Sequence, residues 1–238
     1  MKMSSIAILC GGRGTRLKHH TDSIPKALVK VQGKAILDYI LLQYIEKGYD
    51  DFIICIGCKG EQIKTHCNEK YKGICNITFS DAGENASMLE RVYMLKDSFD
   101  DAILVSYGDT LTDLDINSMK LFHKEKRAGI TITTAKITSP FGIVTFDDEC
   151  WATSYIEKPT FNYYIGHFIL EKEIISLMTK DLLSLSDGHG LIGLFNKLIK
   201  IKALAVYEHT GLQVTFNTEE ERSKAEKDIL KFYTFNEK

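Results

Sequence analysis

Three glycines within four positions follow the first apolar run of the chain. Residues 6–9 are apolar and predict a buried strand, and residues 11–14, Gly-Gly-Arg-Gly, predict a tight turn just after it. A turn of this kind lets backbone N–H groups approach an anion closely. The spacing lacks the Gly-Lys-Ser/Thr of a Walker loop and, at Leu17, the third glycine of a dinucleotide fingerprint. It therefore favours a phosphate-binding loop of another kind.

Two cations lie close to this loop in the sequence. Arg16 follows it directly, and Lys26 comes after Pro25. An arginine can bind two phosphate oxygens at once and a lysine acts as a point charge, so the pair suits a triphosphate better than a single phosphate. An ordinary glycine turn with solvated charges explains this motif equally well when the motif is taken alone.

One carboxylate is placed to hold a metal ion near the loop. Residues 102–107 predict a buried strand that is followed by Gly108 and Asp109. Ligands of open parallel sheets bind beyond the carboxyl ends of the strands, so Asp109 should face the same crevice as the glycine loop. A carboxylate beside phosphates would bind Mg²⁺ there. Asp109 could instead be an ordinary polar turn residue. Asp115, a further acid shortly after it, fits the N-cap of a helix better than a metal ligand.

The elements that must hold these residues alternate along the first half of the chain. This alternation predicts an α/β fold with a mixed, mostly parallel central sheet, right-handed crossovers and helices on both faces. Strands are predicted at residues 6–10, 52–56, 74–79 and 102–107, and helices at residues 34–47, 61–71 and 86–95.

From Gly129 onward, strands follow one another with few long helices between them. We expect them to extend the sheet with mixed or antiparallel strands and to build an acceptor pocket. No internal repeat or linker divides the chain, so residues 1–238 are predicted to form a single domain. Strands are predicted at 130–137, 142–146, 153–156, 164–170, 203–208 and 213–216, and helices at 171–180, 190–200 and 218–232.

The composition restricts the partners and the compartment. The 238 residues include 30 basic and 32 acidic side chains, which argues against nucleic acid or a membrane surface as partner. The first apolar run is too short for a signal peptide and no stretch could cross a bilayer, so we expect a cytoplasmic protein. The six cysteines are then free thiols, and Cys55 and Cys58 fit strand cysteines better than a zinc site.

Four motifs, taken together, resemble one enzyme family. They are Leu9-Cys10-Gly11-Gly12-Arg13-Gly14-Thr15-Arg16-Leu17, Pro25-Lys26, Tyr107-Gly108-Asp109 and Glu157-Lys158-Pro159. In this order they resemble the sugar-1-phosphate nucleotidyltransferases. Residues 53–60, 107–116 and 141–142 are most similar to the glucose-1-phosphate cytidylyltransferases of that family. The resemblance implies a Rossmann-like nucleotidyltransferase fold, with a nucleotide-binding half at 1–128 and an acceptor-binding half at 129–238.

The resemblance also implies roles for single residues. Arg16 would contact the β- and γ-phosphates, Lys26 the α-phosphate and Asp109 the Mg²⁺ ion, and these three form the expected catalytic group. Lys158, with Glu157 beside it, would contact the acceptor phosphate, although a surface turn is the simpler interpretation of this tripeptide alone. Residues 81–91 fall where the family recognises the base. The expected nucleotide contacts are Leu9, Gly11, Gly12, Arg13, Gly14, Thr15, Asn85, Ser87 and Gly108.

Two departures from the family pattern affect the acceptor and the metal. The family's Ile-Asn-Gly-Gly-Phe is Tyr-Ile-Gly-His-Phe at residues 164–168, so Ile165 has replaced a hydrogen-bonding side chain and His167 adds a ring. Sugar hydroxyls would be left unsatisfied, and we expect His167 to contact a different acceptor. The family's second metal-binding aspartate falls on Asn217, whose amide oxygen can bind Mg²⁺ without supplying charge.

The resemblance implies a cytidylyltransferase that joins CMP from CTP to a small phosphorylated acceptor and releases pyrophosphate. The altered pocket motif favours a non-sugar acceptor, and the overall likeness to the family favours phosphoglutamine, as used in capsule phosphoramidate biosynthesis. The alternatives are glucose 1-phosphate and phosphocholine, the latter held by an aromatic cage of Trp151, Tyr155, Tyr163 and Tyr164. A non-catalytic CTP- or CDP-binding module is an alternative of another class, and Asn217 keeps it open. A homo-oligomer is compatible with the sequence, which does not fix the number of copies.

Overall fold

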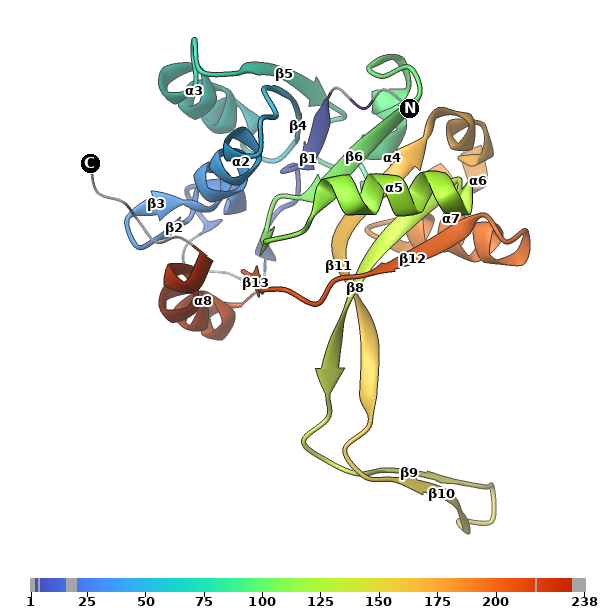
Figure 1. Ribbon diagram of the computed structural model, residues 1–238. Helices are drawn as coiled ribbons and strands as arrows, with labels where there is room; N and C mark the ends of the chain where they lie inside the picture. Colours follow the sequence, from blue (N-terminus) through green and yellow to red (C-terminus); the bar gives the residue numbers. More distant parts are fainter. Residues whose placement is uncertain (1–2, 4, 16–20, 217, 233–238) are drawn as a thin grey trace.

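The structure is a computed structural model that describes residues 3, 5–15, 21–216 and 218–232. Seven strands form its central sheet: β1 (Ile6–Leu9), β4 (Asp51–Ile56), β5 (Asn76–Asp81), β6 (Ala102–Tyr107), β8 (Ile130–Thr138), β11 (Thr160–Glu171) and β12 (Leu204–Glu208). Their order is β12-β8-β11-β6-β1-β4-β5 (Figure 1). Neighbours are parallel except where β11 runs antiparallel to β6 and β8. The expected mixed, mostly parallel sheet is therefore confirmed.

Helices cover both faces of this sheet. They are α2 (Ile36–Glu46), α3 (Gly60–Lys70), α4 (Met88–Tyr93), α5 (Ile116–Lys126), α6 (Lys180–Leu183), α7 (His189–Lys200) and α8 (Glu219–Phe232). Alternate strand residues point to opposite faces, so Ile6 and Ile8 join an apolar cluster with α2, α3 and α5, whereas Ala7 joins a cluster with α4 and α7. A strand buried on both faces is a continuous apolar run, which is why β1 could be predicted.

Two predicted helices are divided in the structure. The helix predicted at 86–95 consists of α4 and the 3₁₀ segment η3 (Met94–Asp97). The helix predicted at 171–180 is the 3₁₀ segment η4 (Lys172–Leu177), and α6 begins only at Lys180. Met178 ends η4 because its backbone, with ψ 73°, is not helical.

Two short sheets complete the body. The strands β2 (Lys30–Val31) and β3 (Lys34–Ala35) form one antiparallel pair, and β7 (Thr110–Thr112) and β13 (Gln213–Thr215) form the other. Beside the second pair, the backbone N–H of Phe216 donates to the carbonyl of Asp109 at 3.1 Å. The carboxyl-terminal part of the chain thereby fixes the backbone at the end of β6. Among the described residues, no helix combines the length and the apolar character needed to cross a bilayer.

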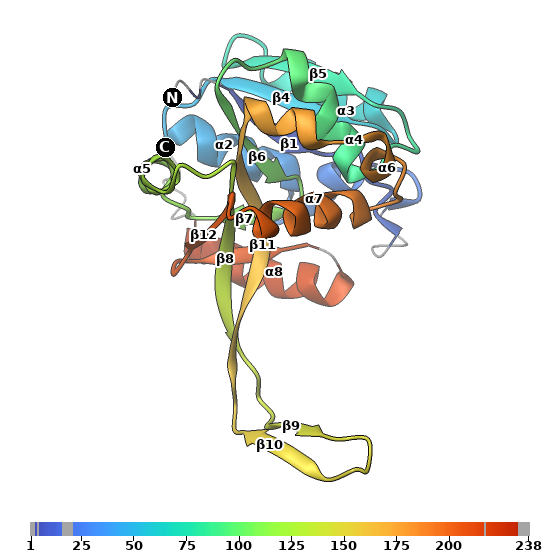
Figure 2. The same ribbon diagram turned by 90° about the vertical axis from the view of Figure 1, so that its right-hand side faces the viewer.

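A long arm, which we define as residues 137–161, leaves the body between β8 and β11. The outer parts of these two strands run away from the sheet together, and β9 (Ile143–Phe146) and β10 (Ala152–Ile156) pair at the tip (Figures 1 and 2). The strands predicted at 142–146 and 153–156 are therefore confirmed. The expectation that they extend the central sheet is wrong, because β9 and β10 pair with each other. All of their residues are exposed.

Candidate functional site

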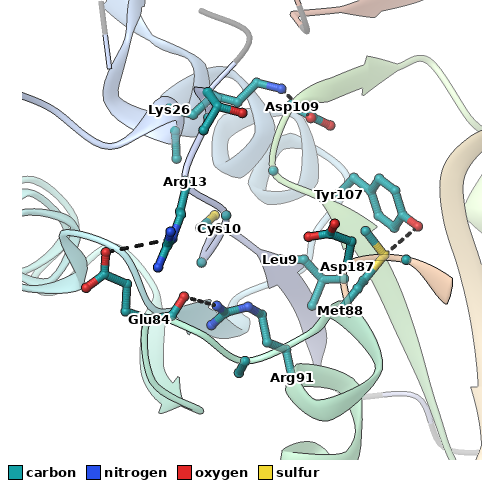
Figure 3. A pocket seen from close by; sticks show the side chains of 18 of the residues that line it. Leu9, Cys10, Arg13, Lys26, Glu84, Met88, Arg91, Tyr107, Asp109 and Asp187 are labelled. Atoms are coloured by element: carbon teal, nitrogen blue, oxygen red, sulfur yellow. Dashed lines mark hydrogen bonds and ion pairs between the residues drawn. The ribbon is translucent and has the colours of Figure 1, made fainter. Parts of the chain in front are cut away.

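The strands β1 and β6 end side by side at the carboxyl edge of the sheet. Leu9 lies opposite Tyr107 in the strand register, and the backbone N–H of Gly108 donates to the Leu9 carbonyl at 3.0 Å. A Cβ at position 108 would lie 2.7 Å from that carbonyl oxygen, so only glycine fits this approach. Beyond this point the two segments diverge and line a cavity of about 800 Å³ (Figure 3).

Two members of the expected catalytic group meet in this cavity. Lys26 begins the 3₁₀ segment η2 (Lys26–Leu28), and its Nζ donates to Asp109 Oδ2 at 2.6 Å. Both side chains line the cavity and are largely buried, with exposed fractions of 15% and 22%. The fold thus joins a cation and a carboxylate that are 83 positions apart in the sequence. Arg16, the third member of the group, lies outside the described residues.

The glycine loop forms one wall of the cavity, and residues 9–15 all line it. Gly14 has a φ of +66°, a backbone conformation that disfavours other residues, and a Cβ there would lie 3.0 Å from the Cβ of Lys26. A Cβ on Gly11 would clash with the guanidinium of Arg91, whereas one on Gly12 would meet open space. Gly12 therefore leaves room in front of the loop, which is what the approach of a phosphate requires.

Arg91 lines the cavity, although the sequence indicated only the segment 81–91 and gave this residue no role of its own. Its side chain is 5% exposed, and Nη1 donates to the carbonyl of Ile56 at 2.6 Å while Nη2 donates to the carbonyl of Glu84 at 3.4 Å. The guanidinium lies beneath Gly11 and connects the end of β4 to the loop that precedes α4. A single arginine in a helix carries no pattern that would have revealed this position.

The segment expected to recognise the base reaches the cavity only in part. Asn85 lines the cavity, where its side chain is hydrogen-bonded to Arg13, and Arg13 also faces Glu84 at 3.9 Å. Ser87 is buried, and its hydroxyl accepts the backbone N–H of Glu90 at 3.2 Å as the N-cap of α4. The structure therefore uses the Ser87 side chain for helix capping.

The three expected acceptor residues do not line the cavity. Glu157 and Lys158 lie on the exposed arm, where the Tyr155 hydroxyl donates to Glu157 Oε2 at 2.7 Å. Trp151 and Tyr155 also lie on the arm, whereas Tyr164 packs in the body, so the structure does not gather the aromatic residues weighed for a cage. The roles of Glu157 and Lys158 stay predictions.

His167 lies in β11, inside the body. It is 1% exposed, and its ring nitrogens lie 3.2 Å from Ser106 Oγ and 3.0 Å from the carbonyl oxygen of Ile165. Burial lowers the pKa of His167 to about 4, so the ring is neutral at physiological pH. Contact between His167 and the acceptor stays a prediction. The neighbouring Gly166, with φ +79°, packs against the ring of Tyr107, which does line the cavity.

A loop before α7 forms part of the cavity wall across from the glycine loop. Ser186, Asp187 and Gly188 line it together with Tyr107 and Met88. The Tyr107 hydroxyl donates to Met88 Sδ at 2.8 Å, and the backbone N–H of Met88 donates to the Asp187 carbonyl at 3.0 Å. The Asp-Gly sequence is a common turn signal but gave no indication of a site.

The metal-binding capacity of the site rests on Asp109. The described residues contain no group of three or more His, Cys, Asp or Glu side chains that could hold a metal ion, and Cys55 is buried in β4. Magnesium usually binds through one or two carboxylates together with substrate phosphates, so a single carboxylate beside a phosphate loop fits an ion that arrives with a nucleotide. Asn217, the second expected ligand, lies outside the described residues.

Known relatives cover most of the chain. A probable glucose-1-phosphate cytidylyltransferase of Bacillus subtilis is 30% identical over an alignment of 234 positions that covers 89% of this chain and 90% of the relative. The glucose-1-phosphate cytidylyltransferase of Salmonella typhi is 32% identical over an alignment of 202 positions that covers 73% of this chain and 77% of the relative.

Solved structures show the same fold at lower identity. A putative glucose-1-phosphate thymidylyltransferase from Bacillus anthracis, in complex with a sucrose, superposes with a TM-score of 0.76 and 17% identity over 99% of this chain and 98% of that one. HddC from Yersinia pseudotuberculosis, complexed with GMP-PN, superposes with a TM-score of 0.74 and 20% identity over 95% and 100%. The profile of one family, Nucleotidyl transferase, matches residues 6–210. The chain thus belongs to the nucleotidyl transferase family and is a nucleotidyltransferase.

Proposed function

We propose that this chain is a cytidylyltransferase that transfers CMP from CTP to a small phosphorylated acceptor and releases pyrophosphate. The observation that carries the proposal is the contact of Lys26 with Asp109 at 2.6 Å, beside the glycine loop and within one cavity. The two cytidylyltransferase-named relatives support the choice of CTP. In this proposal residues 1–128 bind the nucleotide and residues 129–238 bind the acceptor.

The cavity residues suit a direct phosphoryl-group displacement. An oxygen of the acceptor phosphate forms a bond to the α-phosphorus of CTP while the α–β anhydride bond breaks, and the electron pair leaves with pyrophosphate. The acceptor phosphate is already ionised at neutral pH, so no residue has to remove a proton. Such a reaction depends on positioning and on neutralising charge.

Each part of the cavity has a role in that displacement. Backbone N–H groups of the loop at Gly11 and Gly12 would hold phosphate oxygens, and Lys26 would exchange Asp109 for the α-phosphate. Enzymes of this family generally use a divalent metal ion, and we propose Mg²⁺ held by Asp109 and the phosphates. Bound there, the ion would neutralise charge that develops on the leaving pyrophosphate.

For the acceptor we propose a non-sugar phosphate, with phosphoglutamine favoured and capsule phosphoramidate biosynthesis as the setting. The support is the departure from the family's sugar-pocket pattern at residues 164–168, where a buried Ile165 stands in place of the asparagine that the resemblance implies. Glucose 1-phosphate, named for the relatives, and phosphocholine are the alternatives.

Pyrophosphate release tests this proposal directly. The purified protein would be incubated with Mg²⁺, with CTP, UTP, dTTP or GTP, and with each of phosphoglutamine, phosphocholine and glucose 1-phosphate. We expect release with CTP and most rapidly with phosphoglutamine. Preference for glucose 1-phosphate would reject the non-sugar acceptor. Binding of CTP without release for any acceptor would instead favour a non-catalytic CTP- or CDP-binding module.

We further propose that the protein works in the cytoplasm as a homo-oligomer whose arm contacts a second copy. Free cysteines suit a reducing compartment. Large apolar side chains on the arm are exposed to solvent: Phe141 is 74% exposed and Trp151 is 72% exposed. Two-stranded ribbons are at best marginally stable in water, so a partner surface would stabilise the arm. The acidic tip at residues 147–149 and the basic end of α5 at residues 124–127 suit a head-to-tail contact.

A further inference from the structure

Most charged side chains that line the cavity are paired within the protein. Lys26 contacts Asp109 at 2.6 Å, and Arg13 faces Glu84 at 3.9 Å. The carboxylate of Asp187 differs, because the residue is exposed to solvent and its side chain has no hydrogen bond or ion pair with any residue that the structure describes. A carboxylate without a partner in a cavity built for phosphates repels those phosphates unless a cation opposes it.

Backbone hydrogen bonds hold the loop that carries Asp187. Asp187 has a φ of 51°, a left-handed conformation that is unfavourable for most residues. The loop is held on both sides, since the N–H of Met88 donates to the Asp187 carbonyl at 3.0 Å and the N–H of His189 donates to the Ser186 carbonyl at 3.1 Å. Figure 3 shows the carboxylate in the hollow beside Leu9, Tyr107 and Met88.

The surroundings of Asp187 suit an organic cation. The nearby ring of Tyr107 is held by its hydrogen bond to Met88, and aromatic faces attract ammonium groups. The cavity therefore combines cations at the glycine loop for phosphates with a carboxylate and an aromatic ring at the opposite side.

We propose that Asp187 binds a positively charged nitrogen of the acceptor, so that the acceptor is a zwitterion with a phosphate at one end and an ammonium group at the other. This inference rests on the proposed transfer of CMP to a phosphorylated acceptor. It assigns Asp187 the role of selecting amine-bearing acceptors against neutral ones. The competing explanation is that Asp187, which precedes α7 by two residues, only stabilises the amino terminus of that helix.

Matched pairs of acceptors separate these explanations. Phosphocholine would be compared with 3,3-dimethylbutyl phosphate, its carbon isostere, which keeps the phosphate and lacks the positive charge, and phosphoglutamine with its analogue that lacks the α-amino group. The kcat/KM of each would be measured for the wild type, for Asp187→Asn, and for Asp181→Asn as a control at an exposed residue of α6, outside the cavity. Asparagine keeps the size of the side chain and tolerates the left-handed backbone.

We expect Asp187→Asn to lower kcat/KM by about 10- to 100-fold for at least one acceptor with a positively charged nitrogen. The kcat/KM of the matched acceptor without that nitrogen and the KM of CTP should change little. Asp181→Asn should leave the preference of the wild type intact. An equal loss for both members of every pair, accompanied by a lower melting temperature, would assign Asp187 to helix stability and overturn the inference. A wild type without any preference for charged members would overturn it as well.

A binding measurement keeps this inference distinct from the proposed reaction. Calorimetric titration of the same pairs into protein saturated with a non-hydrolysable CTP analogue reports the acceptor subsite without turnover. If no acceptor released pyrophosphate, the proposed transferase activity would fail. Preferential binding of a charged member that is lost in Asp187→Asn would still support the role of Asp187, and equal binding of both members would reject it.

Discussion

Lys26 and Asp109 form the contact on which the proposed chemistry depends most. Asp109→Asn keeps the size of the side chain but removes the negative charge that would hold a metal ion and orient Lys26. Because Asp109 follows a strand and an asparagine oxygen can still accept the hydrogen bond from Lys26, the fold should tolerate the change. We expect kcat for pyrophosphate release to fall by about 100-fold or more with an unchanged melting temperature.

Asp115 provides a control for this experiment. Its carboxylate caps α5 by accepting the backbone N–H of Ser118 at 3.0 Å, and it does not line the cavity. Asp115→Ala should lower the free energy of unfolding by about 1 kcal/mol and leave kcat unchanged. Full activity of Asp109→Asn at saturating Mg²⁺ would contradict the role given to Asp109.

His167 makes stability depend on pH in a definite window. Its pKa is lowered by burial to about 4 in the folded protein, against about 6.5 in the unfolded chain. Between these values the unfolded chain binds more protons, so the free energy of unfolding falls as the pH drops from 6.5 to 4, by up to about 3 kcal/mol.

Urea unfolding between pH 4 and pH 7 measures this effect. The variant His167→Gln removes the titrating ring, and the fall in stability across the window should become shallower. His189→Gln, at an exposed histidine on α7, should retain the slope of the wild type. Identical slopes for wild type and His167→Gln would show that His167 does not contribute.

At the scale of elements, the glycine loop rests on α4 through Arg91. A Cβ on Gly11 would clash with the Arg91 guanidinium, and a Cβ on Gly12 would meet nothing within 4 Å. Gly11→Ala should therefore cost about 1–3 kcal/mol of unfolding free energy, as overpacking does. Gly12→Ala should leave stability unchanged but raise the KM for CTP, because the methyl group occupies space in front of the loop.

Chemical unfolding and CTP kinetics of the two alanine variants test this difference. The two changes add the same methyl group to neighbouring glycines, so backbone entropy alone cannot separate their stabilities. Equal stabilities would mean that Arg91 moves aside at little cost, and the packing argument would then be wrong. An unchanged KM for CTP in Gly12→Ala would show that phosphates do not approach the loop at this residue.

Elements that follow from local pattern could be predicted from the sequence. β6 agrees residue by residue with the predicted strand at 102–107, since it is covered on both faces and begins with four apolar residues, at 102–105. Lys26 and Asp109 were found because a loop and a strand end carry their own signals. Arg91 and Asp187 were not found, because their importance comes from contacts between segments that are distant in the sequence. The register of β11 buries His167 among neighbouring strands, which the sequence did not indicate, and its contact with the acceptor stays a prediction.

At the scale of the whole molecule, the arm is the feature that sequence reasoning misplaced. Its strands carry the same apolar and β-branched residues as strands of the sheet, so composition could not show that they leave the body. If the arm contacts a second copy, replacing Phe141 and Trp151 with serine should shift the protein to a monomer. Light scattering after size-exclusion chromatography would measure this.

The exposure of the arm makes this test specific. Both side chains project from a part of the chain outside the two apolar clusters of the body, so their loss should leave the melting temperature of the isolated monomer unchanged. Serine at Ile192, which is exposed on α7 away from the arm, is the control and should retain the mass of the wild type. A wild type that is monomeric at all concentrations would reject the contact between copies.

The strand order of the central sheet also determines when each strand can pair during synthesis of the chain. The first 107 residues contain β1, β4, β5 and β6, which can pair as they leave the ribosome. The other edge of β6 stays unpaired until β11 has been synthesised. β11 ends 64 residues after β6, from residue 107 to residue 171, which takes roughly 3–13 s at bacterial and eukaryotic elongation rates. For these seconds the nascent chain presents an apolar edge strand, the kind of surface that binds chaperones or other unfinished chains.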